Sequence, residues 1–230
     1  MKMHTILLFS VSLILSACGG GGSSAPVASM STFNVKQAFE NFIKTPDTKN
    51  ALFSGTVNGV TLTGNGRATF GGLVPSTFQG VNALLKTSVL TGTLSDGKDV
   101  VPVATTALTY WDSNYNFLGR SGGDFSVVTK FVPLSTAAKI NDTGSFYTLT
   151  NYPSSTKSYI KDTTTVSFSL IADSETSAIV TLIKETKDTS GKRVSSESET
   201  YRVTTSNVLT MISETMYISA SNATLTITYQ

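Results

Sequence analysis

The sequence predicts an all-β fold, an antiparallel meander of about ten to twelve strands with one short N-terminal amphipathic helix. Apolar and polar residues alternate in many segments from residue 51 onward, which is the period of strands that bury one face. Turn sequences such as Asn58-Gly59 separate these segments and favour hairpins. Charged residues make up 14% of the chain, against about 25% in an average domain, so Ser and Thr supply much of the polar surface. These patterns fit a closed barrel, a half-barrel or two packed sheets.

The helix is expected over Val35–Ile43. Asn34 can cap its first turn, with Gln37 completing a capping-box pattern, and Pro46 ends it. Its apolar stripe comprises Val35, Ala38, Phe39, Phe42 and Ile43. A helix this short is not stable alone, so the stripe must pack on something. Packing against a sheet face or a barrel end and serving as a lid over a cavity are both compatible with it.

The strands are expected in eleven alternating segments, and Gly71–Gly80 is expected to be a loop. Gly64 and Gly66 interrupt the second segment and indicate a bulge or a sharp coil. Residues 178–183 are apolar on both faces and are expected to lie centrally in a sheet. In chain order the segments are Ala51–Val57, Val60–Phe70, Ala83–Leu94, Val100–Trp111, Phe125–Val132, Phe146–Tyr152, Val166–Ile171, Ala178–Lys187, Arg193–Val203, Val208–Ser219 and Ala223–Tyr229.

The head of the chain predicts an export signal. Lys2 precedes an apolar run of about ten residues, which rises only about 15 Å as a helix and cannot span a bilayer. The run ends in Leu15-Ser16-Ala17-Cys18, which resembles the lipobox of bacterial lipoproteins. The resemblance implies that a signal peptidase of class II recognises Leu15, Ser16 and Ala17 and cleaves before Cys18. It also implies that the Cys18 thiol carries a diacylglyceryl group, with palmitate-type chains that anchor the protein stably in a membrane.

The residues after Cys18 extend this resemblance. Cys18 is the only cysteine, so it has no disulfide partner within the chain. A glycine-rich spacer follows, and Gly19 stands where an aspartate retains such lipoproteins in the inner membrane. The resemblance therefore implies a protein of the outer membrane, facing the periplasm or the cell surface. Beyond this head, the chain is similar to uncharacterised proteobacterial lipoproteins that begin Cys-Gly-Gly-Gly-Gly.

The chain accordingly divides into three parts. Residues 1–17 form the signal peptide, residues 18–32 the lipidated cysteine with its Gly/Ser tether, and residues 33–230 the β domain. Similar spacing of turns and strands suggests that the domain has two similar halves, about 51–135 and 140–230.

Composition excludes several kinds of chemistry. The single histidine, His4, lies in the signal peptide, so the mature chain lacks the imidazole that Ser-His-Asp and Cys-His triads and common zinc sites require. The net charge is +2, and the sequence contains no block of like-charged residues. Nucleic acid is therefore not an expected partner. We therefore predict no enzymatic activity, no metal and no cofactor. Charged residues in Arg193–Val203 also argue against a lipid-facing strand of a pore.

Two short motifs offer alternatives. Asp142-Thr143-Gly144-Ser145 is similar to the active-site tetrapeptide of aspartic proteases, which need two such aspartates. A second Asp-(Thr/Ser)-Gly is missing, and we interpret the motif as a turn. The densest aromatic and polar patch contains Trp111, Asp112, Asn114 and Tyr115. It could stack on a sugar ring, or its rings could face the core while the polar residues turn the chain.

The sequence thus predicts a lipid-anchored cell-envelope protein with a non-catalytic β domain for binding, scaffolding or surface interaction. Its partners would be the membrane, through Cys18, and an unknown envelope protein, glycan or apolar ligand. Two alternatives are a periplasmic carrier of a lipid or other apolar ligand in a half-barrel, and a histidine-free hydrolase using paired carboxylates. The mixed-charge hairpin from Lys184 to Arg202 is interpreted as a solvated face.

Overall fold

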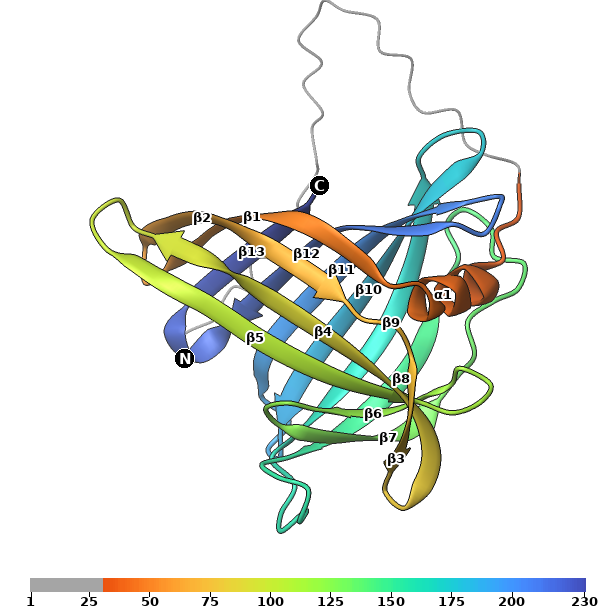
Figure 1. Cartoon of the computed structure of the whole chain (residues 1–230), viewed down its shortest axis with the longest axis horizontal. Coiled ribbons are helices and arrows are strands. Elements are labelled where there is room, and N and C mark those ends of the chain that lie inside the picture. The colour runs from red at the N-terminus through yellow and green to blue at the C-terminus, as the bar shows by residue number, and fades with distance from the viewer. Residues whose placement is uncertain (1–30) are drawn as a thin grey trace, which may run out of the picture.

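The computed structural model describes residues 31–230, which form an antiparallel β-barrel with one α-helix at one end (Figure 1). The predicted signal peptide, the lipobox with Cys18 and nearly all of the tether lie outside the described residues. The elements are α1 Val35–Lys44, β1 Asp47–Val57, β2 Val60–Phe70, β3 Val74–Phe78, β4 Val81–Ser95, β5 Val100–Trp111, β6 Phe117–Ser121, β7 Phe125–Phe131, β8 Thr143–Tyr152, β9 Asp162–Ala172, β10 Ser177–Asp188, β11 Arg193–Thr204, β12 Leu209–Ile218, the 3-10 turn η1 Ser219–Ser221 and β13 Ala223–Tyr229.

The strands close into a ring. From β4 to β13 each strand pairs with the next along the chain, β13 returns to β1, and β2 pairs with both β1 and β4. The pairing of β2 with β4 closes the barrel, and β3 lies outside the ring as a hairpin partner of the first part of β4. The all-β antiparallel prediction is confirmed, and the closed barrel is the arrangement adopted. Both predicted halves contribute to this one sheet, and their similarity stays a prediction.

Alternation along the strands sorts residues between the interior and the outer surface. On β9, Val166, Phe168 and Leu170 are buried, and Ser167 and Ser169 between them are more exposed. The buried residues join a core cluster that includes residues of α1, so this cluster joins the helix to the inner face of the barrel. The outward positions of β9 itself are largely Ser and Thr, which water solvates.

Glycines allow the ring to close at the seam between β2 and β4. A Cβ atom on Gly66 would lie 2.2 Å from the carbonyl oxygen of Thr91 and 2.7 Å from the ring of Phe53. The predicted bulge at Gly64 and Gly66 is wrong, because the ladder of β2 with β1 runs without a register shift. These glycines instead give room for the partner strand and for an inward aromatic ring.

Two unpredicted strands, β3 and β6, and the environment of β10 add further detail. Gly71–Gly80 contains strand β3, whose buried Phe78 stacks on Tyr110 with ring centroids 4.5 Å apart. Strand β6 was not predicted, because its five residues are too few to show a period. On β10 the inward residues are buried, but outward Ile183 is 45% exposed. The prediction that residues 178–183 lie centrally in a sheet is confirmed, since β10 pairs with β9 on one side and β11 on the other; Ile183 is exposed because the barrel wall is a single layer.

Helix α1 forms as predicted and packs on the barrel end. The Asn34 Oδ1 atom accepts a hydrogen bond of 3.0 Å from the backbone N–H of Gln37. At the other end of α1 the buried ammonium of Lys86, on β4, donates to the carbonyl oxygens of Phe42, Ile43 and Thr45 at 3.3, 2.8 and 3.1 Å. These three bonds fix the C-terminal turn of α1 to the barrel wall. Among residues 31–230, no helix is long and apolar enough to cross a membrane.

Candidate binding site inside the barrel

A cavity of about 630 Å³ occupies the barrel interior beneath α1. Its volume falls within the range of about 300–1,000 Å³ that is usual for small-molecule sites. Phe39, Phe42 and Ile43 of α1 line one end, and inward side chains of the strands line the walls. The lining is mixed, with Phe, Leu and Met side chains beside Ser, Thr, Lys and Glu. The cavity therefore offers an apolar surface and a charged surface to one occupant.

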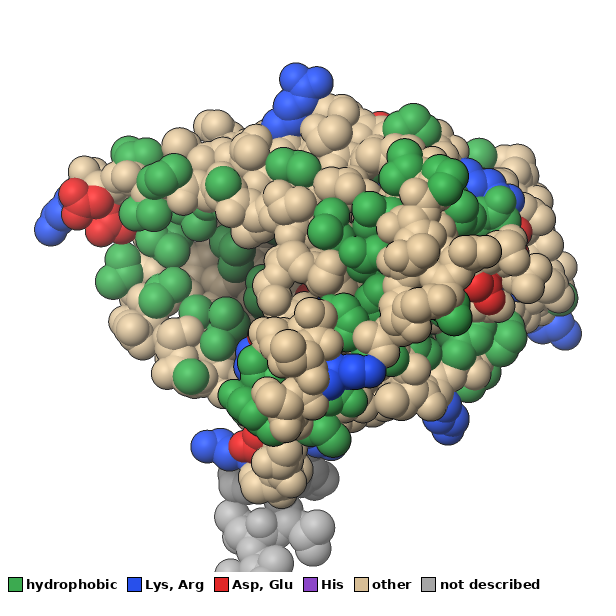
Figure 2. All heavy atoms as spheres, turned by 60° about the horizontal axis from the view of Figure 1, so that its bottom comes forward, with side chains coloured by type: hydrophobic (Ala, Val, Ile, Leu, Met, Phe, Trp, Pro, Cys, Tyr) green, Lys and Arg blue, Asp and Glu red, His purple; other side chains and the backbone are tan. Residues whose placement is uncertain are grey.

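The cavity opens to solvent beside β5. Strand β5 pairs with β6 only from Leu108 to Trp111, and β6 and β7 share only two residue pairs. The first half of β5 therefore has a free edge, because the short strands β6 and β7 do not extend along it. Thr105 and Thr106 line the cavity at this edge. Figure 2 shows a hollow bordered by hydrophobic side chains near the charged tip of the β4–β5 hairpin. Pro102 lies on this free edge, where the lack of an N–H group disfavours pairing with a further strand.

One wall of the cavity carries an ion-pair cluster. The ammonium of Lys184 contacts a carboxylate oxygen of Glu197 and lies 2.6 Å from one of Glu199. The Tyr201 hydroxyl donates to the other oxygen of Glu199 at 3.0 Å. The exposed fractions of the Lys184, Glu197 and Glu199 side chains are 13%, 20% and 17%. The interpretation of this hairpin as a solvated face is wrong for these three residues, which line the cavity.

Strand register explains why these charges meet. Lys184 pairs directly with Glu197 across β10 and β11, and Glu199 and Tyr201 follow on the same face because side chains alternate along a strand. Although burial opposes ionisation, the two carboxylates raise the pKa of Lys184 well above its ordinary value. Burial likewise opposes the ionised form of Glu197, but Lys184 holds the pKa of that carboxyl below its ordinary value. These two groups are therefore ionised together.

Glu214, on β12, is the third carboxyl group of this wall. A bulge in β12 sets the direction of its side chain, since Thr200 pairs with Ser213 but Tyr201 pairs with Met211. The extra residue of the bulge lets Met211 and Glu214, three positions apart, face the same side. Both therefore line the cavity. The Tyr229 hydroxyl donates to the Glu214 Oε2 atom at 3.2 Å. Burial, followed by the nearby carboxylates of Glu197 and Glu199, raises the pKa of Glu214 to about 7.

We call the wall that carries Glu197, Glu199 and Glu214 the acidic wall. Aromatic rings lie next to it on the side of α1. Phe42 packs on Phe70 and on Tyr201 with centroid distances of 6.0 and 5.5 Å. Phe70 in turn packs on Tyr229 at 6.1 Å. Burial raises the pKa values of both tyrosines, so their phenols stay protonated and donate to the glutamates. We call Phe42, Phe70, Tyr201 and Tyr229 the aromatic wall.

The opposite side of the barrel supplies the other cations that line the cavity. Arg120, on β6, donates from Nε to the Ser126 hydroxyl at 3.3 Å. Lys86 is turned toward the end of α1, and burial lowers its pKa to about 8. The Lys86 ammonium is thus largely charged at neutral pH and already has three carbonyl partners.

The predicted sugar-binding residues lie at the α1 end of the barrel. The Trp111 ring packs on Phe117 at 4.9 Å, donates from Nε1 to the Thr109 hydroxyl, and lines the cavity. The Asp112 carboxylate accepts from the side chain and backbone N–H of Asn116, so it is used within its own turn. Asn114 is exposed, and the Lys44 ammonium lies 4.0 Å from the Tyr115 ring centroid.

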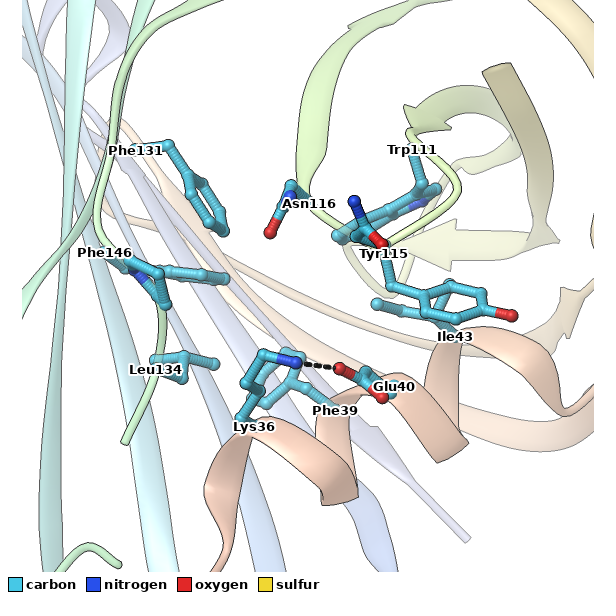
Figure 3. A pocket seen from close by; sticks show the side chains of 12 residues that line it. Lys36, Phe39, Glu40, Ile43, Trp111, Tyr115, Asn116, Phe131, Leu134 and Phe146 are labelled. Atoms are coloured by element: carbon cyan, nitrogen blue, oxygen red, sulfur yellow. Dashed lines mark hydrogen bonds and ion pairs between the residues drawn. The ribbon is translucent and has the colours of Figure 1, made fainter. Parts of the chain in front are cut away.

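These residues also border a small crevice between α1 and the β5–β6 connection (Figure 3). Its volume of about 20 Å³ has room for about one water molecule. Trp111 and Phe39 point toward it, Tyr115 lies over the end of α1 next to Ile43, and Lys36 pairs with Glu40 beside it. The crevice is too small for a sugar ring, so Trp111 contributes to the large cavity rather than to a surface platform.

Asp142 lies in a turn, as the sequence interpretation expects. Its exposed carboxylate accepts from the backbone N–H of Lys139 at 2.8 Å, and the preceding Asn141 has a φ of 73°. Within residues 31–230, no group of three or more His, Cys, Asp or Glu residues is placed to hold a metal ion.

Sequence reasoning did not find the acidic wall, although a signal for it was present. Glu197, Glu199 and Tyr201 share one strand face, and the hairpin brings Lys184 opposite them. The face that carries the two glutamates, the tyrosine and the single lysine differs in composition from the outer face of the same hairpin, and this difference was the signal. What the sequence did not provide was the side of the sheet that faces the interior.

Comparison with known proteins assigns no family to the chain. No family model matches the chain, and no curated protein matches it. Among solved structures, the chain is similar to a DUF1329 family protein from Desulfovibrio piger, with 10% sequence identity and a TM-score of 0.38 over 86% of this chain and 90% of that chain.

Proposed function

We propose that this chain is a lipid-anchored envelope protein whose barrel binds one small amphiphilic molecule without converting it. The cavity carries the proposal, because about 630 Å³ of space lies beneath α1 and communicates with solvent beside β5. A core that served only stability would be filled, since protein interiors are close-packed. The mixed lining favours an amphiphile, which narrows the alternative of a carrier for a lipid or other apolar ligand.

A cavity-filling variant tests the proposal. Ser88, on β4, lines the cavity, and Thr91 on the same strand is exposed and does not line it. We expect the parent chain to bind one molecule of the neutral fluorescent probe N-phenyl-1-naphthylamine, measured by titration calorimetry. Ser88→Trp should weaken this binding at least tenfold because the indole occupies the cavity, and Thr91→Trp should not. Equal binding by both variants would place the probe elsewhere and contradict the proposal.

A second candidate function rests on the two opposite carboxyl pKa shifts. Glu214 has a raised pKa and Glu197 a lowered one in the same cavity, which is how glycoside hydrolases separate an acid from a base. Incubation with chromogenic glycosides decides between the candidates. Turnover that disappears in Glu214→Gln would favour the hydrolase, and a ligand recovered unchanged would favour binding.

The membrane attachment is tested separately. The lipobox resemblance predicts that Cys18 is acylated and holds the barrel at the outer membrane. Labelled palmitate should enter the expressed parent protein but not Cys18→Ser, and the variant should leave the membrane fraction. Equal labelling or equal retention of the two proteins would contradict this attachment.

A further inference from the structure

We infer that the occupant of the cavity is a cationic amphiphile, an organic ammonium with an apolar chain, whose charged head lies between Glu214 and the aromatic wall. This inference rests on the proposed binding function and specifies its ligand. It follows from three features of the wall formed by β10 to β13: its charge balance, the partners of Glu214 and the position of the rings.

The charge balance of this wall is acidic. Lys184 is the one cation that lines the cavity from β10 to β13 within the described chain, and Glu197, Glu199 and Glu214 face it there. The Lys184 ammonium is shared between Glu197 and Glu199. The wall therefore holds more carboxyl groups than one lysine neutralises, and an added cation would be attracted to it.

Glu214 is the carboxyl group that this lysine does not satisfy. Its hydrogen-bond donor is the neutral phenol of Tyr229, on Oε2, and no lysine or arginine lies within ion-pair distance among residues 31–230. Arg120 lines the cavity from β6, where its Nε atom donates to the Ser126 hydroxyl. A ligand ammonium at Glu214 would supply the missing positive charge and favour the ionised form of this carboxyl group.

The rings beside Glu214 suit the same head group. Tyr229 contacts the Glu214 carboxyl through its hydroxyl, and Phe70 and Phe42 extend the aromatic wall from it toward α1. Ring faces attract ammonium groups, and an aromatic cage beside a carboxylate is a recurrent way of holding quaternary ammonium ligands. Met216 and Leu182 line the cavity nearby and offer an apolar surface to the chain of the ligand.

Three octyl compounds with different heads test the inference on the full chain carrying Cys18→Ser. We expect octyltrimethylammonium to bind at least tenfold more tightly than octanoate or 1-octanol at pH 8, by titration calorimetry. Glu214→Gln should weaken ammonium binding about tenfold and leave 1-octanol binding unchanged, and Glu214→Asp should restore part of the loss. Glu185→Gln, at an outward carboxyl on β10 that is 40% exposed, is the control. Thermal melts of all variants verify that they are folded.

Acidification gives a second readout. The groups that face Glu214 are Lys184, Glu197, Glu199, Tyr201 and Tyr229, with Arg120 and Tyr147 farther across the cavity. Because the tyrosines and Lys184 keep their protons over this range, protonation of Glu214 should weaken ammonium binding as the pH falls from 8 to 5. The same change should be much smaller in Glu214→Gln.

Each contrary result has a distinct meaning. Equal affinities for the three heads, or tighter octanoate binding that is lost in Arg120→Gln, would overturn the cationic ligand and leave the binding function intact. Failure of all three compounds and of the naphthylamine probe to bind would overturn the proposed function itself.

Discussion

Charged side chains inside the barrel are the residues on which both stability and binding depend. Lys184 holds two carboxylates in a cavity where neither is fully hydrated. Removing one member of a buried ion pair costs more than the pair itself contributes, because the remaining charges lose their compensation. The cluster should therefore be sensitive to single substitutions and tolerant of complete neutralisation.

Lys184→Met should lower the free energy of unfolding by roughly 3 kcal/mol at pH 8. The loss should shrink near pH 5, because the uncompensated carboxyl groups then take up protons. Urea unfolding at the two pH values measures both effects. Lys187→Met is the control, since that lysine lies on the same strand and is 51% exposed. The triple variant Lys184→Met, Glu197→Gln, Glu199→Gln should recover much of the loss; a triple variant less stable than the single one would contradict the argument.

Glu214 makes stability depend on pH in the opposite sense from an ordinary salt-bridged acid. Its folded-state pKa of about 7 exceeds the ordinary value of 4.5, so the folded protein keeps a proton that the unfolded chain loses between these values. The stability contributed by this group is present below pH 4.5 and is lost as the pH rises to about 7.

Glu214→Gln should therefore be more stable relative to the parent at pH 8 than at pH 5, by roughly 1–3 kcal/mol. Chemical unfolding at both values measures the difference, with Glu185→Gln as the outward control. A difference between variant and parent that does not change with pH would mean that the folded state leaves the pKa of Glu214 near its ordinary value.

At the scale of elements, α1 depends on one side chain of a strand. The Lys86 ammonium satisfies three carbonyl oxygens at the C-terminal end of α1, where a positive charge also favours the helix dipole. Lys86→Met should lower the free energy of unfolding by roughly 1–3 kcal/mol, because carbonyl groups lose their donor. Unfolding in urea checks this, with Lys98→Met in the exposed β4–β5 turn as the control. Equal stability of the two variants would show that other contacts hold α1.

The second prediction about elements concerns the close approach of β2 and β4 at Gly92. A Cβ atom on Gly92 would lie 2.3 Å from the carbonyl oxygen of Asn65 and 2.7 Å from the Phe53 ring. Gly92→Ala should therefore force the strands apart and cost roughly 1–3 kcal/mol. Gly72→Ala is the matched control, because nothing lies within 4 Å of its added Cβ atom. The midpoints of urea unfolding for the two variants measure this difference. Equal midpoints would mean that the strands can move apart at Gly92 without loss of stability.

Local features of the fold were predictable and remote ones were not. Helix α1 follows from the Asn34 cap and a stripe with helical period, and the longer strands follow from alternation. Closure into a barrel depends on β2 meeting β4, where Gly66 and Gly92 approach each other across the seam. A single sequence shows such glycines without showing which strand they face. The acidic wall was missed for a related reason: Glu197 and Glu199 alternate as on any half-buried strand, and the sequence does not show that their face lines a cavity.

At the scale of the whole molecule, the ring of strands holds the cavity open and leaves one part of the wall weak. Strands β9, β10 and β11 have partners on both sides along nearly their full length. The first half of β5 has β4 as its partner strand on one side only. Backbone amides that lack a partner exchange with solvent quickly, and those in doubly paired strands exchange through larger opening events. The cavity is therefore expected to have a rigid acidic wall and a mobile entrance.

Hydrogen exchange followed by mass spectrometry tests this distribution. Peptides covering 178–186 should exchange far more slowly than those covering 100–106. Saturating octyltrimethylammonium should slow exchange in α1 and in peptides covering 209–217, because the ligand contacts these walls, and should leave β3 outside the ring unchanged. Uniform slowing across all strands would indicate global stabilisation without a defined position for the ligand. Protection confined to β3 would place the ligand outside the barrel and contradict the cavity as the binding site.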